Sequence, residues 1–274
     1  MSDRTSLHLW TADFHLANNV RSPYNRLSFG KFSSCLNIVT DNLKRKGHFT
    51  MIRQMVYFLL VSLLTLLLFS QDLLFSQDTE WRQLFNGKDL EGWDHIGPGE
   101  FVIEDGVLKS VGGMGLLWYT GEKFSNCVIR IVFTVEDNNV NSGVFIRIPE
   151  IPEDPWEVVN TGYEVQIDNG FRFDSDDYHV TGVLYSLTKG MAYPQKRPGE
   201  WNTMDITLDG PITIVHVNGK KVTHYAEGQP VPKERRWYEP VRGPRPESGY
   251  IGLQNHDEES TAYFKEVSVK PLPE

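Results

Sequence analysis

Residues 77–274 consist of short runs in which apolar and polar side chains alternate, with turn pairs between the runs. Within Cys127–Phe133, every second residue is apolar, which is the period of a β-strand. The pairs Asp105-Gly106 and Asn218-Gly219 each join two such runs, and both favour the tight turn of a β-hairpin. No stretch of this region has a convincing helical period. The pattern therefore predicts an all-β domain.

The number of these runs indicates how the strands are arranged. About a dozen strands in ~200 residues, without crossover helices, predict two antiparallel sheets packed face to face, as a β-sandwich or jelly roll. Residues 229–247 are the exception, because they contain five prolines and many charges. We expect a long surface loop there, and loops of that length are often functional. The further predicted strands are Val144–Ile148, Tyr163–Asp168, Val183–Tyr185, Met204–Leu208, Ile212–Val217, Tyr250–Gln254 and Tyr263–Val269.

The chain of 274 residues has a formal net charge of −9 that is unevenly distributed. Residues 1–76 contain twice as many basic as acidic residues, so the remainder is strongly acidic. An acidic surface repels phosphate backbones, which argues against a nucleic-acid partner. With only two cysteines, the chain is not a small domain stabilised by several disulfides.

An apolar leader precedes the β-rich region. Residues 55–69 are almost continuously apolar and follow a basic flank, which is typical of a secretory signal. We expect 51–76 to be a signal peptide, or an uncleaved anchor and then the chain's only contact with a membrane. Residues 1–50 are interpreted as a non-native or disordered extension, with translation starting at Met51. The protein is therefore expected to be exported, to the periplasm or beyond. Mass spectrometry of the native N-terminus tests this start, because a peptide from residues 1–40 would contradict it.

The strand Gly162–Asp168 carries an acidic face. Glu164, Gln166 and Asp168 lie at every second position, so in a regular strand all three point to one side. The intervening residues are apolar and belong to the core. Such a polar row is an ordinary solvated face or the floor of a sugar-binding groove, and the strand alone does not decide between them.

Six phrases in order along the chain resemble one bacterial family, the 3-keto-disaccharide hydrolase domain, formerly a domain of unknown function. The resemblance runs from about residue 80 to the C-terminus and implies a concanavalin-A-like jelly roll. For some members it implies hydrolysis of glycosides oxidised at sugar carbon 3. The sequence departs from the family pattern after His256, where Asp257 stands in place of the usual glycine. The phrases are Leu84–Trp93, Asn141–Arg147, Gly162–Asp168, Thr181–Tyr185, Gly199–Asn202 and Ile251–His256.

A 3-keto sugar needs a base for the acidified proton on carbon 2, a donor to the ketone oxygen and an acid for the leaving group. We expect Glu164 to be the base, Arg147 the oxyanion stabiliser, and His256 or His179 the acid. Arg147 forming a salt bridge to the acidic strand is an equally good interpretation. The expected substrate-binding residues are Asn141, Gln166, Asp168, His179, Tyr185, Trp156 and Gln254.

Other functions stay open at this point. A lectin-like module that binds sugar without catalysis fits the same fold. A conventional glucanase is less favoured, because Glu164 and Asp168 have Cα atoms about 13 Å apart in a regular strand, farther than paired carboxylates allow. No cofactor is expected. Asp174, Asp176 and Asp177 make calcium conceivable, although a solvated loop is the simpler interpretation.

Overall fold

The computed structural model describes residues 57–62, 80–170, 176–234 and 236–273. The chain divides into two compact units, Met1–Phe75 and Ser76–Glu274. In the first unit the described residues 57–62 are helical. Among all described residues, no helix has the length and apolar character needed to cross a membrane. Most of the leader, its basic flank and Met51 lie outside the described residues, so the signal peptide and the start at Met51 stay predictions.

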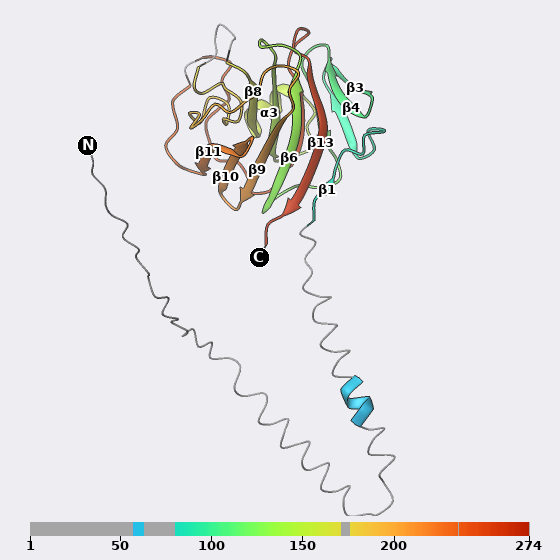
Figure 1. Ribbon diagram of the computed structural model, residues 1–274. Helices are drawn as coiled ribbons and strands as arrows, with labels where there is room; N and C mark the ends of the chain where they lie inside the picture. Colours follow the sequence, from blue (N-terminus) through green and yellow to red (C-terminus); the bar gives the residue numbers. More distant parts are fainter. Residues whose placement is uncertain (1–56, 63–79, 171–175, 235, 274) are drawn as a thin grey trace, which may run out of the picture. The chain divides into compact units, whose positions relative to one another are not determined.

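Two antiparallel sheets make up the second unit (Figure 1). In its described residues, the larger sheet has eight strands in the order β11-β10-β9-β6-β13-β4-β3, with β1 paired to β13, and the smaller has five in the order β2-β5-β12-β7-β8. The larger sheet contains β1 (Arg82–Gln83), β3 (Glu100–Glu104), β4 (Val107–Val111), β6 (Cys127–Val135), β9 (Asn202–Asp209), β10 (Ile212–Val217), β11 (Lys220–Ala226) and β13 (Ala262–Pro271). The smaller contains β2 (Trp93–Ile96), β5 (Gly115–Tyr119), β7 (Asn141–Ile148), β8 (Tyr163–Asp168) and β12 (Tyr250–Asn255). The prediction of a two-sheet jelly roll is confirmed.

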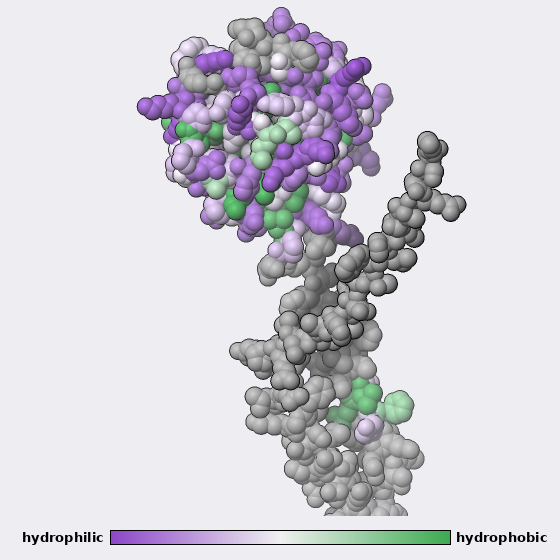
Figure 2. Space-filling view, turned by 60° about the vertical axis from the view of Figure 1, so that its left-hand side comes forward, coloured by the Kyte–Doolittle hydropathy of each residue, from purple (hydrophilic) through white to green (hydrophobic). Residues whose placement is uncertain are grey.

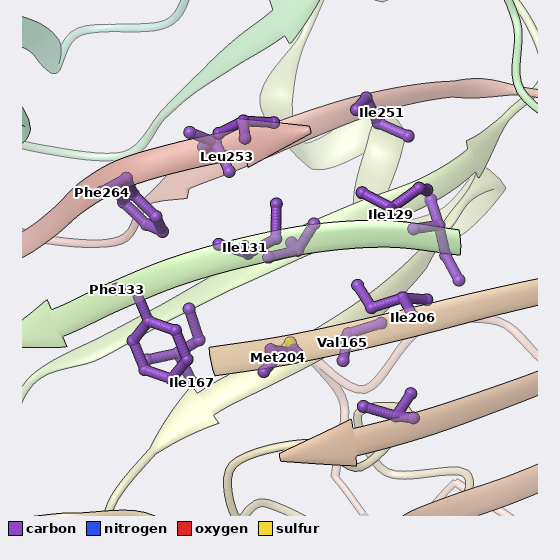
Figure 3. Close-up of a cluster of buried hydrophobic side chains, with 14 of the residues drawn as sticks. Ile129, Ile131, Phe133, Val165, Ile167, Met204, Ile206, Ile251, Leu253 and Phe264 are labelled. Atoms are coloured by element: carbon purple, nitrogen blue, oxygen red, sulfur yellow. The ribbon is translucent and has the colours of Figure 1, made fainter. Parts of the chain in front are cut away.

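The core lies between the two sheets, because alternate residues of each strand face the opposite sheet. Ile131 of β6 and Ile206 of β9 meet Val165 of β8 and Leu253 of β12 in this layer (Figure 3). All four side chains are buried. On the outside, hydrophilic side chains cover most of the face shown in Figure 2, and hydrophobic ones occur there in small groups.

Both predicted hairpin turns are present. Asp105 and Gly106 have φ values of 51° and 79°, and Asn218 and Gly219 have 49° and 75°. A type I′ turn requires positive φ at both central residues, which asparagine, aspartate and glycine tolerate best. These turns fix the registers of β3 with β4 and of β10 with β11.

Two local predictions were wrong. The helix α3 (Pro155–Thr161) interrupts the all-β pattern, because the Asp154 side chain caps the Trp156 amide at 2.7 Å and Pro155 favours a first helical turn. Residues 183–185 form no strand and contribute only an isolated bridge between Val165 and Leu184. The chain turns on both sides of this bridge, since Gly182 and Ser186 have φ values of 91° and 58°.

Candidate functional site

The outer face of the smaller sheet carries the polar row. In the pairing of β7 with β8, Glu164 lies opposite Phe145, Gln166 opposite Gly143 and Asp168 opposite Asn141. Directly paired residues project to the same face of a sheet. These side chains therefore share the outer face, while Val165 and Ile167 are completely buried in the core.

A cavity of about 350 Å³ lies over this face. Nine of the ten side chains expected in the site line it, from β7, β8, β12, α3 and the segments that follow β8 and β12. Arg147 is the exception. The lining residues are Met114, Asn141, Trp156, Val159, Glu164, Gln166, Asp168, His179, Tyr185, Trp237, Tyr238, Gln254 and His256. The structure brings the nine together, but their roles stay predictions.

Glu164 is a buried acid of this cavity with a strongly perturbed pKa. The residue is 8% exposed, and among the described residues no group donates a hydrogen bond to its carboxylate. Burial, together with the nearby charge of Asp168, raises the pKa of Glu164 to about 8. Desolvation disfavours the charged form, so this carboxylate is a strong base when it is ionised.

Gly143 makes room for the Glu164 carboxylate. A Cβ built on Gly143 would lie 2.5 Å from Oε1 of Glu164 and 2.7 Å from its Cγ. The glycine at this position of β7 therefore lets the acid lie close to the sheet.

We expect Gly143→Ala to lower kcat about 10- to 100-fold, because small displacements of a catalytic group have effects of this size. The rate of turnover of a keto sugar measures the effect on activity, and thermal unfolding measures the effect on stability. Gly113→Ala is the matched control, since its added Cβ would meet only Pro98 at an ordinary 3.7 Å. Equal activity in the two variants would contradict the placement of Glu164.

Two histidines in the cavity are each paired with an aspartate. Nδ1 of His179 lies 2.6 Å from Oδ1 of Asp176, and Nδ1 of His256 lies 2.7 Å from Oδ2 of Asp257. Hydrogen bonding to His256 lowers the pKa of Asp257, which keeps that carboxylate ionised. An aspartate at Nδ1 orients the ring and leaves Nε2 for a ligand or a proton. The His256-Asp257 sequence, which departs from the family pattern, thus produces a second oriented imidazole.

Three buried polar atoms of the cavity have no hydrogen-bond partner among the residues that the structure describes. They are Nε2 of His179, Oε1 of Gln166 and Oε1 of Gln254. The Gln166 amide nitrogen donates to Oδ1 of Asn141 at 2.7 Å, which fixes the orientation of both side chains. Unpaired buried polar groups are costly, so these three atoms are available to hydrogen-bond a polar ligand or water.

Sequence reasoning missed four lining residues, which are Met114, Val159, Trp237 and Tyr238. Trp237 and Tyr238 belong to residues 229–247, and the prolines of that segment predicted a functional loop without indicating which of its side chains face the cavity. Val159 lies on α3, which was not predicted at all.

The aspartates considered for calcium have other partners. Asp176 contacts His179, and Asp177 accepts from Lys189 at 2.7 Å and from the Tyr193 hydroxyl at 2.6 Å. Asp174 lies outside the described residues. In the described part of the chain, no group of three or more His, Cys, Asp or Glu side chains is placed to hold a metal ion.

The expectation for Arg147 needs correction, because its side chain does not reach the cavity. Its φ of 56° and a register shift in the pairing of β7 with β12 turn the side chain toward the other sheet. There the guanidinium donates to the carbonyls of Pro246 at 2.9 Å and Gly210 at 2.8 Å. It forms neither the oxyanion contact nor the expected salt bridge to the acidic strand. Regular alternation along the strand could not anticipate this bulge.

Arg147→Ala is expected to destabilise the fold by about 2–4 kcal/mol, since it leaves buried carbonyls without a donor. Denaturant unfolding at neutral pH measures this change. Arg130→Ala is the control, because Arg130 pairs with Asp205 where the two side chains are 31% and 30% exposed, and partly exposed pairs contribute about 1 kcal/mol or less. Wild-type stability in the Arg147 variant would contradict a structural role.

Comparisons with known proteins agree with this architecture. The family model for the 3-keto-alpha-glucoside-1,2-lyase-like domain matches residues 80–270. A provisionally named glycosyl hydrolase from Parabacteroides distasonis is 26% identical, with a TM-score of 0.58 over 70% of this chain and 100% of that chain. A second structure from that organism, with the same provisional name, is 24% identical with a TM-score of 0.56, over 70% of this chain and 94% of that one, and shows the shared fold. No curated protein gives a significant match. Because the family model covers more than half of the sequence, this chain belongs to the 3-keto-alpha-glucoside-1,2-lyase-like domain family.

Proposed function

We propose that this protein cleaves 3-keto-glycosides by removing the proton on carbon 2, expelling the group on carbon 1 and then adding water. The observation that carries the proposal is the Glu164 carboxylate, which is buried on the cavity floor, has no hydrogen-bond donor within the described part of the chain and has a pKa raised to about 8. A base of this strength is suited to a proton that a neighbouring ketone has made acidic. Family membership supports the same chemistry.

The steps balance without a cofactor. The Glu164 carboxylate takes the proton from carbon 2, and the electrons of that bond form an enolate with the oxygen on carbon 3. The enolate collapses to the ketone, a double bond forms between carbons 1 and 2, and the bond from carbon 1 to the leaving oxygen breaks. That oxygen receives a proton. Water then adds across the double bond, with its hydroxyl on carbon 1 and a proton on carbon 2.

The two histidines supply the other roles in this proposal. His179 is buried, and none of the described residues bonds its Nε2, so it is suited to donate to the ketone oxygen, the role first expected of Arg147. The His256 side chain is 31% exposed. It is therefore suited to protonate a leaving group that departs toward solvent. Asp176 and Asp257 act as positioning residues through their imidazole partners.

A conventional glycosidase mechanism fits less well. Glu164 and Asp168 lie four residues apart on one regular strand with Gln166 between them. Retaining enzymes hold their carboxyl groups about 5–5.5 Å apart, much closer than residues four positions apart along a strand.

Incubation with 3-keto-trehalose or a 3-keto-glucoside, beside the unoxidised sugars, tests the proposal. We expect the protein to cleave the keto sugars and not the unoxidised ones. Chromatography of the released sugar measures this cleavage. Binding of sugar without turnover would instead indicate a lectin-like module. Cleavage of the unoxidised sugars would indicate an ordinary glycoside hydrolase.

A further inference from the structure

Two tryptophans lie at the cavity with much of their surface in solvent. Trp156 of α3 is 57% exposed, and Trp237 of the loop 229–247 is 94% exposed. Single exposed apolar residues are common on proteins, but two tryptophans lining one cavity form a concentrated apolar surface. Both line a cavity whose floor is polar, so they form its apolar rim.

Arg242 anchors the described residues on both sides of Trp237. The Arg242 guanidinium donates to the carbonyls of Pro232 at 3.0 Å and Pro240 at 2.8 Å, which lie on either side of Trp237 in the sequence. It also donates to the Ser186 hydroxyl at 2.9 Å, next to Tyr185 of the cavity. Because Arg242 already orders these segments, little conformational entropy is lost there when a ligand binds beside Trp237.

The loop is also joined to the helix that carries the other tryptophan. The amide of Val241 donates to Oδ1 of Asn160 in α3 at 3.1 Å. The Arg245 guanidinium donates to the carbonyl of Gly162, the residue that ends this helix, at 3.0 Å. Trp156 and Trp237 therefore belong to two elements that support each other.

The floor and the rim of the cavity are expected to contact different parts of the substrate. The reacting carbons must approach Glu164 on the polar floor, and the cavity of about 350 Å³ is near the lower end of ligand pockets. A second ring attached through carbon 1 must therefore reach the rim. Flat apolar faces of sugar and aryl rings are suited to stacking on indole.

We propose that Trp156 and Trp237 form a second subsite, which holds the ring of the leaving group by stacking. The substrate class is then 3-keto-glycosides whose leaving group is a second pyranose or an aryl ring, in preference to simple alkyl glycosides. This inference rests on the proposed function, because it assigns the floor to the keto sugar.

The test compares 3-keto-trehalose, phenyl 3-keto-glucoside and methyl 3-keto-glucoside on the wild type and on Trp237→Ala. We expect kcat/KM to fall about tenfold for the two ring-bearing substrates and less than about twofold for the methyl glycoside. Arg242→Ala should reproduce this pattern, because it releases the loop without touching the floor. Trp201→Ala is the matched control, since Trp201 stacks under Lys265 and does not line the cavity.

An equal loss for all three substrates, or no loss, would overturn the second subsite. A lower kcat/KM for 3-keto-trehalose alone identifies a sugar ring as the occupant. A lower kcat/KM for the phenyl glycoside as well identifies a subsite that accepts either kind of ring. If the wild type cleaves none of the three, the proposed function fails on that result alone. Calorimetric titration of Glu164→Gln with the same compounds still tests the subsite, because equal affinity for the methyl and ring-bearing compounds would contradict it.

Discussion

Glu164→Gln is expected to lower kcat on a 3-keto-glycoside by about 10²–10⁴-fold, the usual contribution of a general base. Glutamine preserves the shape of the side chain and cannot accept the carbon 2 proton. The expected pH profile has the same cause. The pKa of Glu164 is about 8, so kcat/KM of the wild type should rise with pH and level off above that value.

The same substitution is expected to stabilise the folded protein in alkaline solution. In the folded state the pKa of Glu164 is raised above its unfolded value, so between those two values the folded state holds a proton that the unfolded state has lost. The stability of the wild type therefore falls as pH rises through this window, by at most about 1.4 kcal/mol per pH unit from this one group. Glutamine does not titrate. The free energy of unfolding of the variant should therefore increase relative to that of the wild type as the pH rises from 5 to 8.

Denaturant unfolding at several pH values and initial rates measure the two effects of Glu164→Gln. Glu266→Gln is the matched control, because Glu266 lies on β13 of the other sheet and accepts from the Ser268 hydroxyl at 2.7 Å. Full activity in Glu164→Gln would remove Glu164 as the base. A stability difference that does not change with pH would contradict the raised pKa.

His179→Ala is expected to lower kcat by about 10²–10³-fold, the effect of removing one donor to a developing oxyanion. Since the donor acts on the ketone oxygen, the loss should be similar for a methyl and for a nitrophenyl leaving group. His256→Ala should differ, because it removes the acid for the leaving group. Its loss is expected to be large with the methyl glycoside and small with the nitrophenyl glycoside, whose anion needs no proton to leave.

Rates of both variants on both substrates separate the roles, with His216→Ala on β10 as a control outside the cavity. Asp176→Asn should reproduce the His179 pattern with a smaller loss, since it disturbs the orientation of the ring and leaves the imidazole in place. If His179→Ala spares the nitrophenyl substrate, the roles of the two histidines are exchanged. Wild-type rates in both variants would exclude them from the chemistry.

The sheets and their hairpins were predictable from the sequence because their causes are local. The two-residue period of β8 placed Glu164, Gln166 and Asp168 on one face, and the turn pairs fixed two registers. The sequence did not show which sheet would carry this row, or that α3 and the loop 229–247 would line the cavity above it. Both depend on contacts between distant segments.

Arg147 shows where periodicity stops being informative. A strand with strict alternation would assign its side chain a face by counting, but one residue with φ of 56° and the shifted register with β12 reverse the assignment. Helix α3 was missed for a different reason. It is seven residues long, too short for a helical period to emerge, although Asp154 followed by Pro155 is a readable start signal.

The most direct test of the account follows deuterium placed on carbon 2 of a 3-keto-glycoside during cleavage. If Glu164 removes that proton, the wild type should release the label to water at the rate of cleavage and show a primary isotope effect, and Glu164→Gln should do neither. Proton NMR of the product and solvent during the first turnovers gives the result. Cleavage that leaves the deuterium on carbon 2 would contradict the account, because it would show that the glycosidic bond breaks without abstraction next to the ketone.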